Sequence, residues 1–174
     1  MAGSFWASMM LSMIGGSHTS NAQLPNWLET SPQLVGEARF SLFFFDIYHA
    51  ELFAPDGRYD GAAPFALRLS YMRDVSSQKI VDTSLDEMRR QGSGTASRLA
   101  EWADWMDQHF PDMRNGDEAM VVALTNGGMA LYHNQAKLGQ TDDSVFADAF
   151  FAIWLSDKAL KPDLSRQLRG LGKK

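Results

Sequence analysis

The chain contains no cysteine among its 174 residues. A disulfide bond, a thiolate metal site and a cysteine nucleophile are therefore excluded. Basic residues number 16 against 21 acidic ones, and the formal net charge at pH 7 is −5. Nucleic acids and anionic membrane surfaces attract clustered lysine and arginine, so this charge argues against both as partners. The one basic cluster, the tail at residues 166–174, is short, and we interpret it as a solvated chain end.

Familiar catalytic and cofactor-binding motifs are also missing from the sequence. There is no glycine-rich phosphate loop, no Gly-x-Ser-x-Gly turn and no His-Glu-x-x-His motif. His49, His109 and His133 fall in three different predicted elements, so their spacing indicates no metal site. Acidic pairs such as Asp142 and Asp143 suit helix starts and solvated faces. We therefore predict no catalytic residue, no metal ion and no cofactor.

Long hydrophobic runs are scarce, and the one at residues 5–14 lies near the N-terminus. Small and polar residues follow it as far as Ala22, which is the pattern of a secretory signal cleaved after Ala22. No lysine or arginine precedes Arg39, although a signal normally opens with a basic residue. A cytoplasmic chain with an N-terminal extension is therefore the alternative. We expect a periplasmic protein with residues 1–22 as signal peptide, residues 23–174 as the domain, and no membrane span, because spanning takes roughly 20 apolar residues.

The remaining composition indicates one ordinary globular domain. Hydrophobic residues make up 45% of the chain and charged residues 21%. A chain of this length buries roughly two-thirds of the surface that its unfolded form exposes, so one core is expected. No internal repeat or shift of composition marks a second domain.

Four segments have the residue pattern of strands. Residues 36–53 are rich in phenylalanine, isoleucine and tyrosine without helical spacing, which predicts one long bent strand or two consecutive strands. From residue 64 to 72, apolar residues alternate with polar ones, as in a strand with one solvated face. The apolar runs at 119–124 and 129–133, with an Asn-Gly-Gly sequence between them, predict a hairpin.

Four helices are expected from caps and apolar spacing. Their predicted caps, first-turn residues and breakers are Ser76 or Ser77, Gly92, Thr95, Pro111, Asp142 or Asp143, and Pro162. Their predicted inward residues are Val81, Leu85, Met88, Leu99, Trp102, Ala103, Met106, Phe110, Phe146, Ala149, Phe150, Ile153, Leu164, Leu168 and Leu171. Strands, two helices, a hairpin and two more helices predict an α+β fold, with a mainly antiparallel sheet covered by helices on one face.

Arg39 is unusual because it lies in a segment so rich in phenylalanine. Burying its guanidinium alone would cost several kcal/mol. In one interpretation, Arg39 pairs with Glu37 or Glu51 or is exposed on the solvated face. In the other, its partner is the anion of a ligand, which a planar guanidinium binds with two donors. Trp102 and Met106 can line an apolar pocket, although their helical spacing favours a place in the core.

A set of short motifs runs from about residue 34 to residue 171. They are residues 35–39 (VGEAR), 47–53 (IYHAELF), 69–75 (LSYMRDV), 110–112 (FPD), 116–117 (GD), 150–155 (FFAIWL), 160–164 (LKPDL) and 168–169 (LR). In order and spacing they resemble the chalcone isomerase family, specifically its bacterial chalcone isomerase-like branch. The resemblance implies the family fold, an antiparallel sheet wrapped by helices.

What the resemblance implies about function depends on the branch. In the plant enzymes a phenolate adds to an enone and closes a flavanone ring, whereas in related plant proteins the same cleft holds a fatty acid. Arg39 matches the arginine that both branches keep, and Tyr48 stands where the fatty-acid binders also carry tyrosine. Ile153 takes the place of a threonine of the enzymes and cannot donate a hydrogen bond. The interval from Arg39 to Tyr48 is a few residues shorter than in the plant proteins.

The leading hypothesis is a non-catalytic chalcone isomerase-like protein. It would bind a small amphipathic carboxylate or phenolic ligand, such as a fatty acid, in a cleft between sheet and helices. The candidate ligand-binding residues are Arg39, Tyr48, Phe43, Phe45, Trp102 and Met106. A chalcone isomerase-type intramolecular lyase and a structural or interaction protein without a ligand are the alternatives, and the sequence does not specify an oligomeric state.

Overall fold

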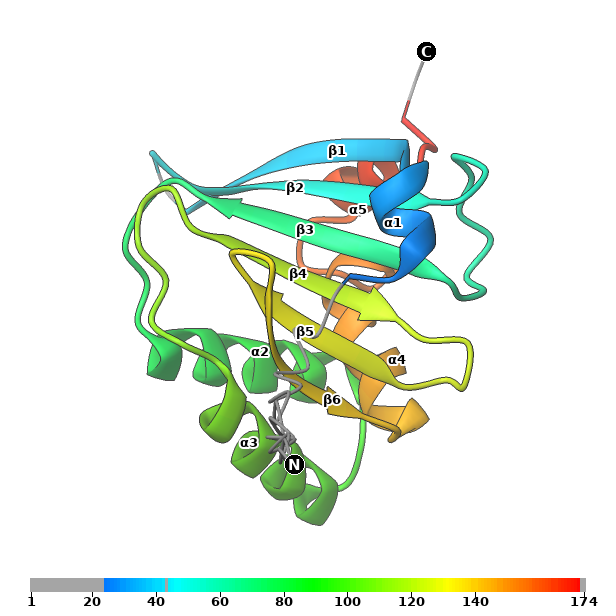
Figure 1. Cartoon of the computed structure of the whole chain (residues 1–174). Helices are drawn as coiled ribbons and strands as arrows, with labels where there is room; N and C mark the ends of the chain where they lie inside the picture. The colour runs from blue at the N-terminus through cyan, green and yellow to red at the C-terminus, as the bar shows by residue number, and fades with distance from the viewer. Residues whose placement is uncertain (1–23, 43, 173–174) are drawn as a thin grey trace, which may run out of the picture.

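One six-stranded antiparallel sheet forms the centre of the molecule (Figure 1). The computed structural model describes residues 24–42 and 44–172, with the side chain of Leu42 left aside. The strands are β1 (Gln33–Leu42), β2 (Phe45–Ala54), β3 (Phe65–Tyr71), β4 (Glu118–Ala123), β5 (Met129–His133) and β6 (Ala136–Thr141). Each strand pairs with the next one along the chain, so the sheet order is the sequence order.

Five helices accompany the sheet in the described residues. They are α1 (Asn26–Thr30), α2 (Ser77–Gln91), α3 (Ala96–His109), α4 (Ser144–Leu155) and α5 (Pro162–Leu168). α5 packs on β1, and α2 packs with both α3 and α4, which together cover one face of the sheet. The short helix α1 lies on the other face, in front of the sheet in Figure 1, where Leu28 packs against Ala66 and Val122. The predicted α+β class with an antiparallel sheet is confirmed, and α1 is an addition to it.

Local capping explains where the long helices begin and end. Ser76, Thr95 and Asp143 each accept a hydrogen bond from the backbone N–H three residues later. These side chains satisfy donors that the first helical turn leaves without a partner. Gly92 ends α2 with a φ of 78°, a left-handed conformation that glycine adopts without a Cβ clash. The sequence alternatives Ser76 or Ser77 and Asp142 or Asp143 are thereby decided.

The predicted helical core residues are largely buried, and the two strands predicted from residues 36–53 are present. Val81, Met88, Met106 and Leu168 have exposed fractions of 1% or less. The prediction for Leu171 was wrong, because α5 ends at Leu168 and Leu171 is 53% exposed. Among the described residues, no helix is long and apolar enough to cross a bilayer. The predicted signal segment lies outside the described residues, so cleavage after Ala22 stays a prediction.

Gly36 allows α5 to lie directly on the sheet. A Cβ atom at this position would fall 2.1 Å from the carbonyl oxygen of Gln167 and 2.7 Å from that of Leu168. Both are backbone carbonyl oxygens in the last two residues of α5. Glycine within a strand often marks such a close backbone approach. Contact between α5 and β1 positions the chain segment before α5 beside this edge strand.

Candidate ligand-binding site

Arg39 lies on the face of the sheet that α1 partly covers. It pairs across the strands with His49, and its side chain is 60% exposed. Its Nη1 atom lies 3.1 Å from Oδ2 of Asp46. A hydrogen bond from the Ser41 hydroxyl, together with Arg39, lowers the pKa of the Asp46 carboxyl. Of the alternatives for Arg39, the structure shows exposure on the solvated face, and the ion-pair partner is Asp46 and not Glu37 or Glu51.

A register shift explains why Asp46 is the partner of Arg39. Tyr48 pairs with Phe40, but the next pair along the hairpin is Ser41 with Asp46, so Ile47 is an extra residue in β2. Such a bulge changes the alternation of side chains between the two faces. Asp46 consequently meets Arg39 and Ser41 on one face.

Tyr48 lies in the core on the opposite face of the sheet. Its hydroxyl accepts a hydrogen bond from Nε1 of Trp154 at 2.9 Å, and its ring stacks on Phe40 with centroids 5.2 Å apart. Burial raises the pKa of Tyr48 to about 12. Successive residues of a strand point to opposite faces, so Tyr48 and the Arg39–His49 pair are separated by the sheet. The structure therefore does not bring Arg39 and Tyr48 into one cleft.

The other predicted site residues are likewise dispersed. Trp102 and Met106 are 2% and 0% exposed in the core, and Trp102 donates from Nε1 to Asp143 at 3.1 Å. Phe45 is 55% exposed and carries the guanidinium of Arg73 over its ring, 4.2 Å from the centroid. Phe43 lies outside the described residues. Their ligand-binding roles stay predictions, and the burial of Trp102 and Met106 agrees with the core interpretation of the helix spacing.

Arg39 does line a cleft, at the free edge of β1. This cleft has a volume of about 350 Å³, and we call it the β1-edge cleft. Its wall consists of Arg39, Ser41, Leu160, Lys161, Pro162, Asp163 and Leu164. The wall combines two cations, a hydroxyl and the single carboxylate of Asp163 with aliphatic side chains, and Leu160 is 66% exposed. An anion with a short apolar body suits such a surface.

A second, larger cleft of about 500 Å³ lies between α4 and the ends of β3 and β4. Its apolar wall includes Phe65, Phe151 and Leu155, and its polar groups include Thr125 and Asp148. None of its wall residues carries a positive charge, and Asp148 adds a negative one. It is therefore less suited to an anionic ligand than the β1-edge cleft.

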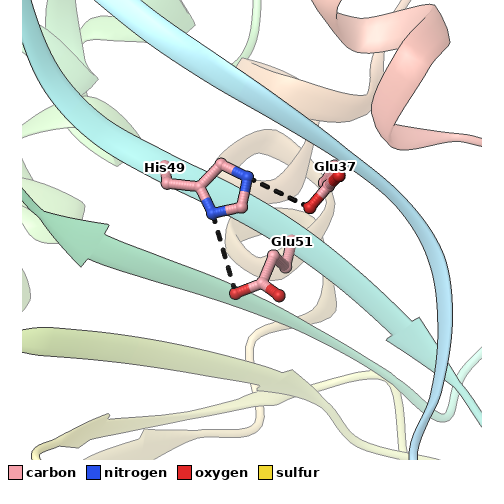
Figure 2. Close-up of side chains that lie close together, drawn as sticks. All are labelled: Glu37, His49 and Glu51. Carbon is pink, nitrogen blue, oxygen red and sulfur yellow. Dashed lines mark ion pairs between the residues drawn. The ribbon is translucent and has the colours of Figure 1, made fainter.

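Glu37, His49 and Glu51 form a compact cluster on the same face as Arg39 (Figure 2). Nε2 of His49 lies 3.2 Å from Glu37, and Nδ1 lies 4.0 Å from Oε2 of Glu51. Each residue offers a ligand atom, and these atoms lie within 4.8 Å of one another, as a metal site would require. However, the carboxylates approach different ring nitrogens, and Arg68 already holds Oε2 of Glu51 at 2.7 Å. The arrangement is that of a surface charge network.

The sequence contains signals for both the Glu37, His49 and Glu51 cluster and the β1-edge cleft. His49 and Glu51 stand two residues apart in a strand, which places them on one face, but the prediction rested on the separation of the three histidines. The wall segment at residues 160–164 is one of the motifs of the family resemblance, which implies no site role for it. Its proximity to Arg39 depends on the packing of α5 on β1, which no local pattern shows.

Comparison with known proteins agrees with this architecture. A family model described as chalcone isomerase-like matches residues 13–170. An uncharacterized protein of Haemophilus influenzae is 26% identical over 164 residues, which cover 94% of this chain and 77% of the relative. The crystal structure of an Arabidopsis thaliana fatty-acid binding protein is similar with a TM-score of 0.62, over 86% of this chain and 90% of that one, at 10% sequence identity. That similarity confirms the predicted fold.

Proposed function

Because the chain belongs to the chalcone isomerase-like family, we propose that it binds a small amphipathic carboxylate, such as a fatty acid, without transforming it. The observation that carries this proposal is the position of Arg39 in the wall of the β1-edge cleft. Further support comes from the fold, since a solved structure with the same fold is a fatty-acid binding protein. The ligand would lie between the edge of the sheet and the start of α5.

The chemistry of the cleft suits both ends of such a ligand. Arginine carries five N–H donors, and Asp46 contacts Arg39 through Nη1, so further donors remain for a carboxylate. Exposed ion pairs contribute little to stability, so exchanging Asp46 for a ligand costs little. Lys161 adds a second positive charge. Leu160 and Leu164 would cover the alkyl chain, and burial of apolar surface favours binding.

The surroundings of Tyr48 favour binding over ring closure. Catalysis of ring closure needs hydrogen-bond donors aimed at the oxygen where charge develops. The Tyr48 hydroxyl lies in the core, accepts from Trp154, and is separated from Arg39 by the sheet. Ile153 has no side-chain donor. Binding a carboxylate needs fewer donors than catalysing ring closure, because one guanidinium can bind a carboxylate with two parallel hydrogen bonds.

Isothermal titration of the purified chain with decanoate tests the proposal. Arg39→Ala is expected to weaken decanoate binding roughly ten- to a hundredfold, because a hydrogen bond to a charged group is lost. Arg58→Ala is the matched control, since Arg58 also pairs with an aspartate at 3.1 Å and is 84% exposed. Arg58→Ala should bind decanoate as tightly as the wild type does. Equal binding by Arg39→Ala, or no binding by the wild type, would overturn the proposal.

A further inference from the structure

The turn between β1 and β2 carries apolar side chains that little else covers. Phe44 is 98% exposed and Phe45 is 55% exposed. Met72 is 40% exposed and lies beside them, because its backbone N–H donates to the carbonyl of Ile47 at 2.9 Å. We call Phe44, Phe45 and Met72 the hairpin tip. Single exposed apolar residues are common, but a group of large ones at one place marks an interaction site.

The hairpin tip is convex. The ladder between β2 and β3 begins at the pair of Tyr48 and Tyr71, so the start of β2 extends beyond the paired part of β3. In Figure 1 the turn between β1 and β2 lies at a corner of the molecule, at the left end of the sheet. A projecting point cannot enclose a ligand or form a broad flat contact. It suits a partner into which it can insert.

Arg73 places a positive charge directly beside the hairpin tip. Arg73 lies over the ring of Phe45, 4.2 Å from its centroid, so its charge is held at the base of the aromatic group. Arg39 and Asp46 neutralise each other at the same end of the hairpin. Guanidinium groups bind phosphate through strong hydrogen bonds, and amphipathic side chains favour the boundary between headgroups and acyl chains.

We propose that the hairpin tip inserts into the interfacial layer of a phospholipid bilayer, with Phe44 deepest and Arg73 at the level of the phosphates. The net charge of −5 gives no general attraction to anionic lipid, so apolar insertion drives the contact and a zwitterionic bilayer suffices. Arg39 lies close to this end of the hairpin, so the β1-edge cleft would be placed near the membrane surface. The inference does not depend on a ligand in that cleft.

Sedimentation with phosphatidylcholine vesicles tests this inference. Phe44→Ser should lower vesicle partitioning roughly ten- to a hundredfold, because one phenylalanine loses its apolar environment. Leu171→Ser is the matched control, since Leu171 is an apolar residue 53% exposed elsewhere on the molecule, and it should partition like the wild type. Partitioning of the wild type should change less than about twofold between low and roughly 0.5 M salt, since screening acts on charges.

Insertion depth gives a second, independent measurement. Phe44→Trp should show blue-shifted emission with vesicles and stronger quenching by brominated phosphatidylcholine than the wild type. Equal sedimentation of wild type and Phe44→Ser, or no sedimentation of the wild type, would overturn the inference. So would a dimer in analytical ultracentrifugation that Phe44→Ser dissociates, without vesicle binding, because the partner would then be a second copy. Decanoate titration of Phe44→Ser keeps the two proposals separate, since its affinity should be unchanged.

Discussion

Replacing Gly36 with alanine is expected to push α5 away from β1. The new Cβ would lie 2.1 Å from the carbonyl oxygen of Gln167, whereas ordinary contact begins at 3.4 Å, so the helix must move by about 1.3 Å. Both obstructing oxygens belong to the backbone, and no side-chain rotation relieves the overlap. Overpacking of this kind costs about 1–3 kcal/mol. Because Leu168 is completely buried at the same contact, we expect a value near the upper end.

Urea unfolding followed by tryptophan fluorescence measures this cost. Gly172→Ala is the matched control, because a Cβ there meets nothing closer than 3.6 Å. For Gly36→Ala we expect a free energy of unfolding about 2–3 kcal/mol below that of the wild type. Decanoate affinity should fall as well, since the start of α5 forms part of the cleft wall. A difference within about 0.5 kcal/mol, the usual effect of a surface substitution, would refute the close contact of α5 with β1.

Three further predictions concern one buried hydrogen bond and the pH dependence of stability. Tyr48→Phe removes the acceptor of Trp154 Nε1 and should lower the free energy of unfolding by about 1–3 kcal/mol in urea titrations. Burial raises the pKa of Tyr48 from 10 to about 12. The contribution of the neutral Tyr48 to the free energy of unfolding should therefore be fully present below pH 10 and be lost as pH rises through 12, by up to about 1.4 kcal/mol per pH unit. An equally steep loss of stability in Tyr48→Phe would contradict this. A hydrogen bond from Asn134, together with hydrogen bonds from Arg114 and His133, lowers the pKa of Asp117 from 3.8 to about 2. The contribution of the ionised Asp117 to the stability of the fold should therefore be fully present above pH 3.8 and be lost as pH falls through 2. Thermal unfolding between pH 5 and pH 2 checks this, and Asp117→Asn should show a smaller loss than the wild type.

Local signals were sufficient to predict most of the fold. The alternation in β3 and the caps Ser76 and Thr95 depend on neighbouring residues alone, so they can be read from the sequence. β6 was not predicted, because the segment Ala136–Thr141 is only partly apolar and is a strand through its pairing with β5. The helix α1 has five residues, too few for a helical period to be visible.

The candidate site was less predictable, because it depends on register and on distant contacts. Whether Arg39 and Tyr48 share a face is decided by the turn and the bulge of one hairpin, and a shift of one residue reverses the answer. The wall of the β1-edge cleft opposite Arg39 is the segment at residues 160–164, and only the packing of α5 on β1 brings this segment close to Arg39. Composition and spacing identified Arg39 as a residue of interest without giving its surroundings.

The sequential order of the strands has a consequence for how the chain folds. Four of the five strand pairings join segments separated by short connections, whereas β3 and β4 are separated by residues 72–117, which contain α2 and α3. Closing that longer loop costs about 2 kcal/mol more chain entropy than closing a hairpin of a few residues. The sheet therefore consists of two parts, β1–β3 and β4–β6, each built from local contacts and joined along a single seam. Because folding slows as contacts become less local, we expect the contacts across this seam to limit the folding rate.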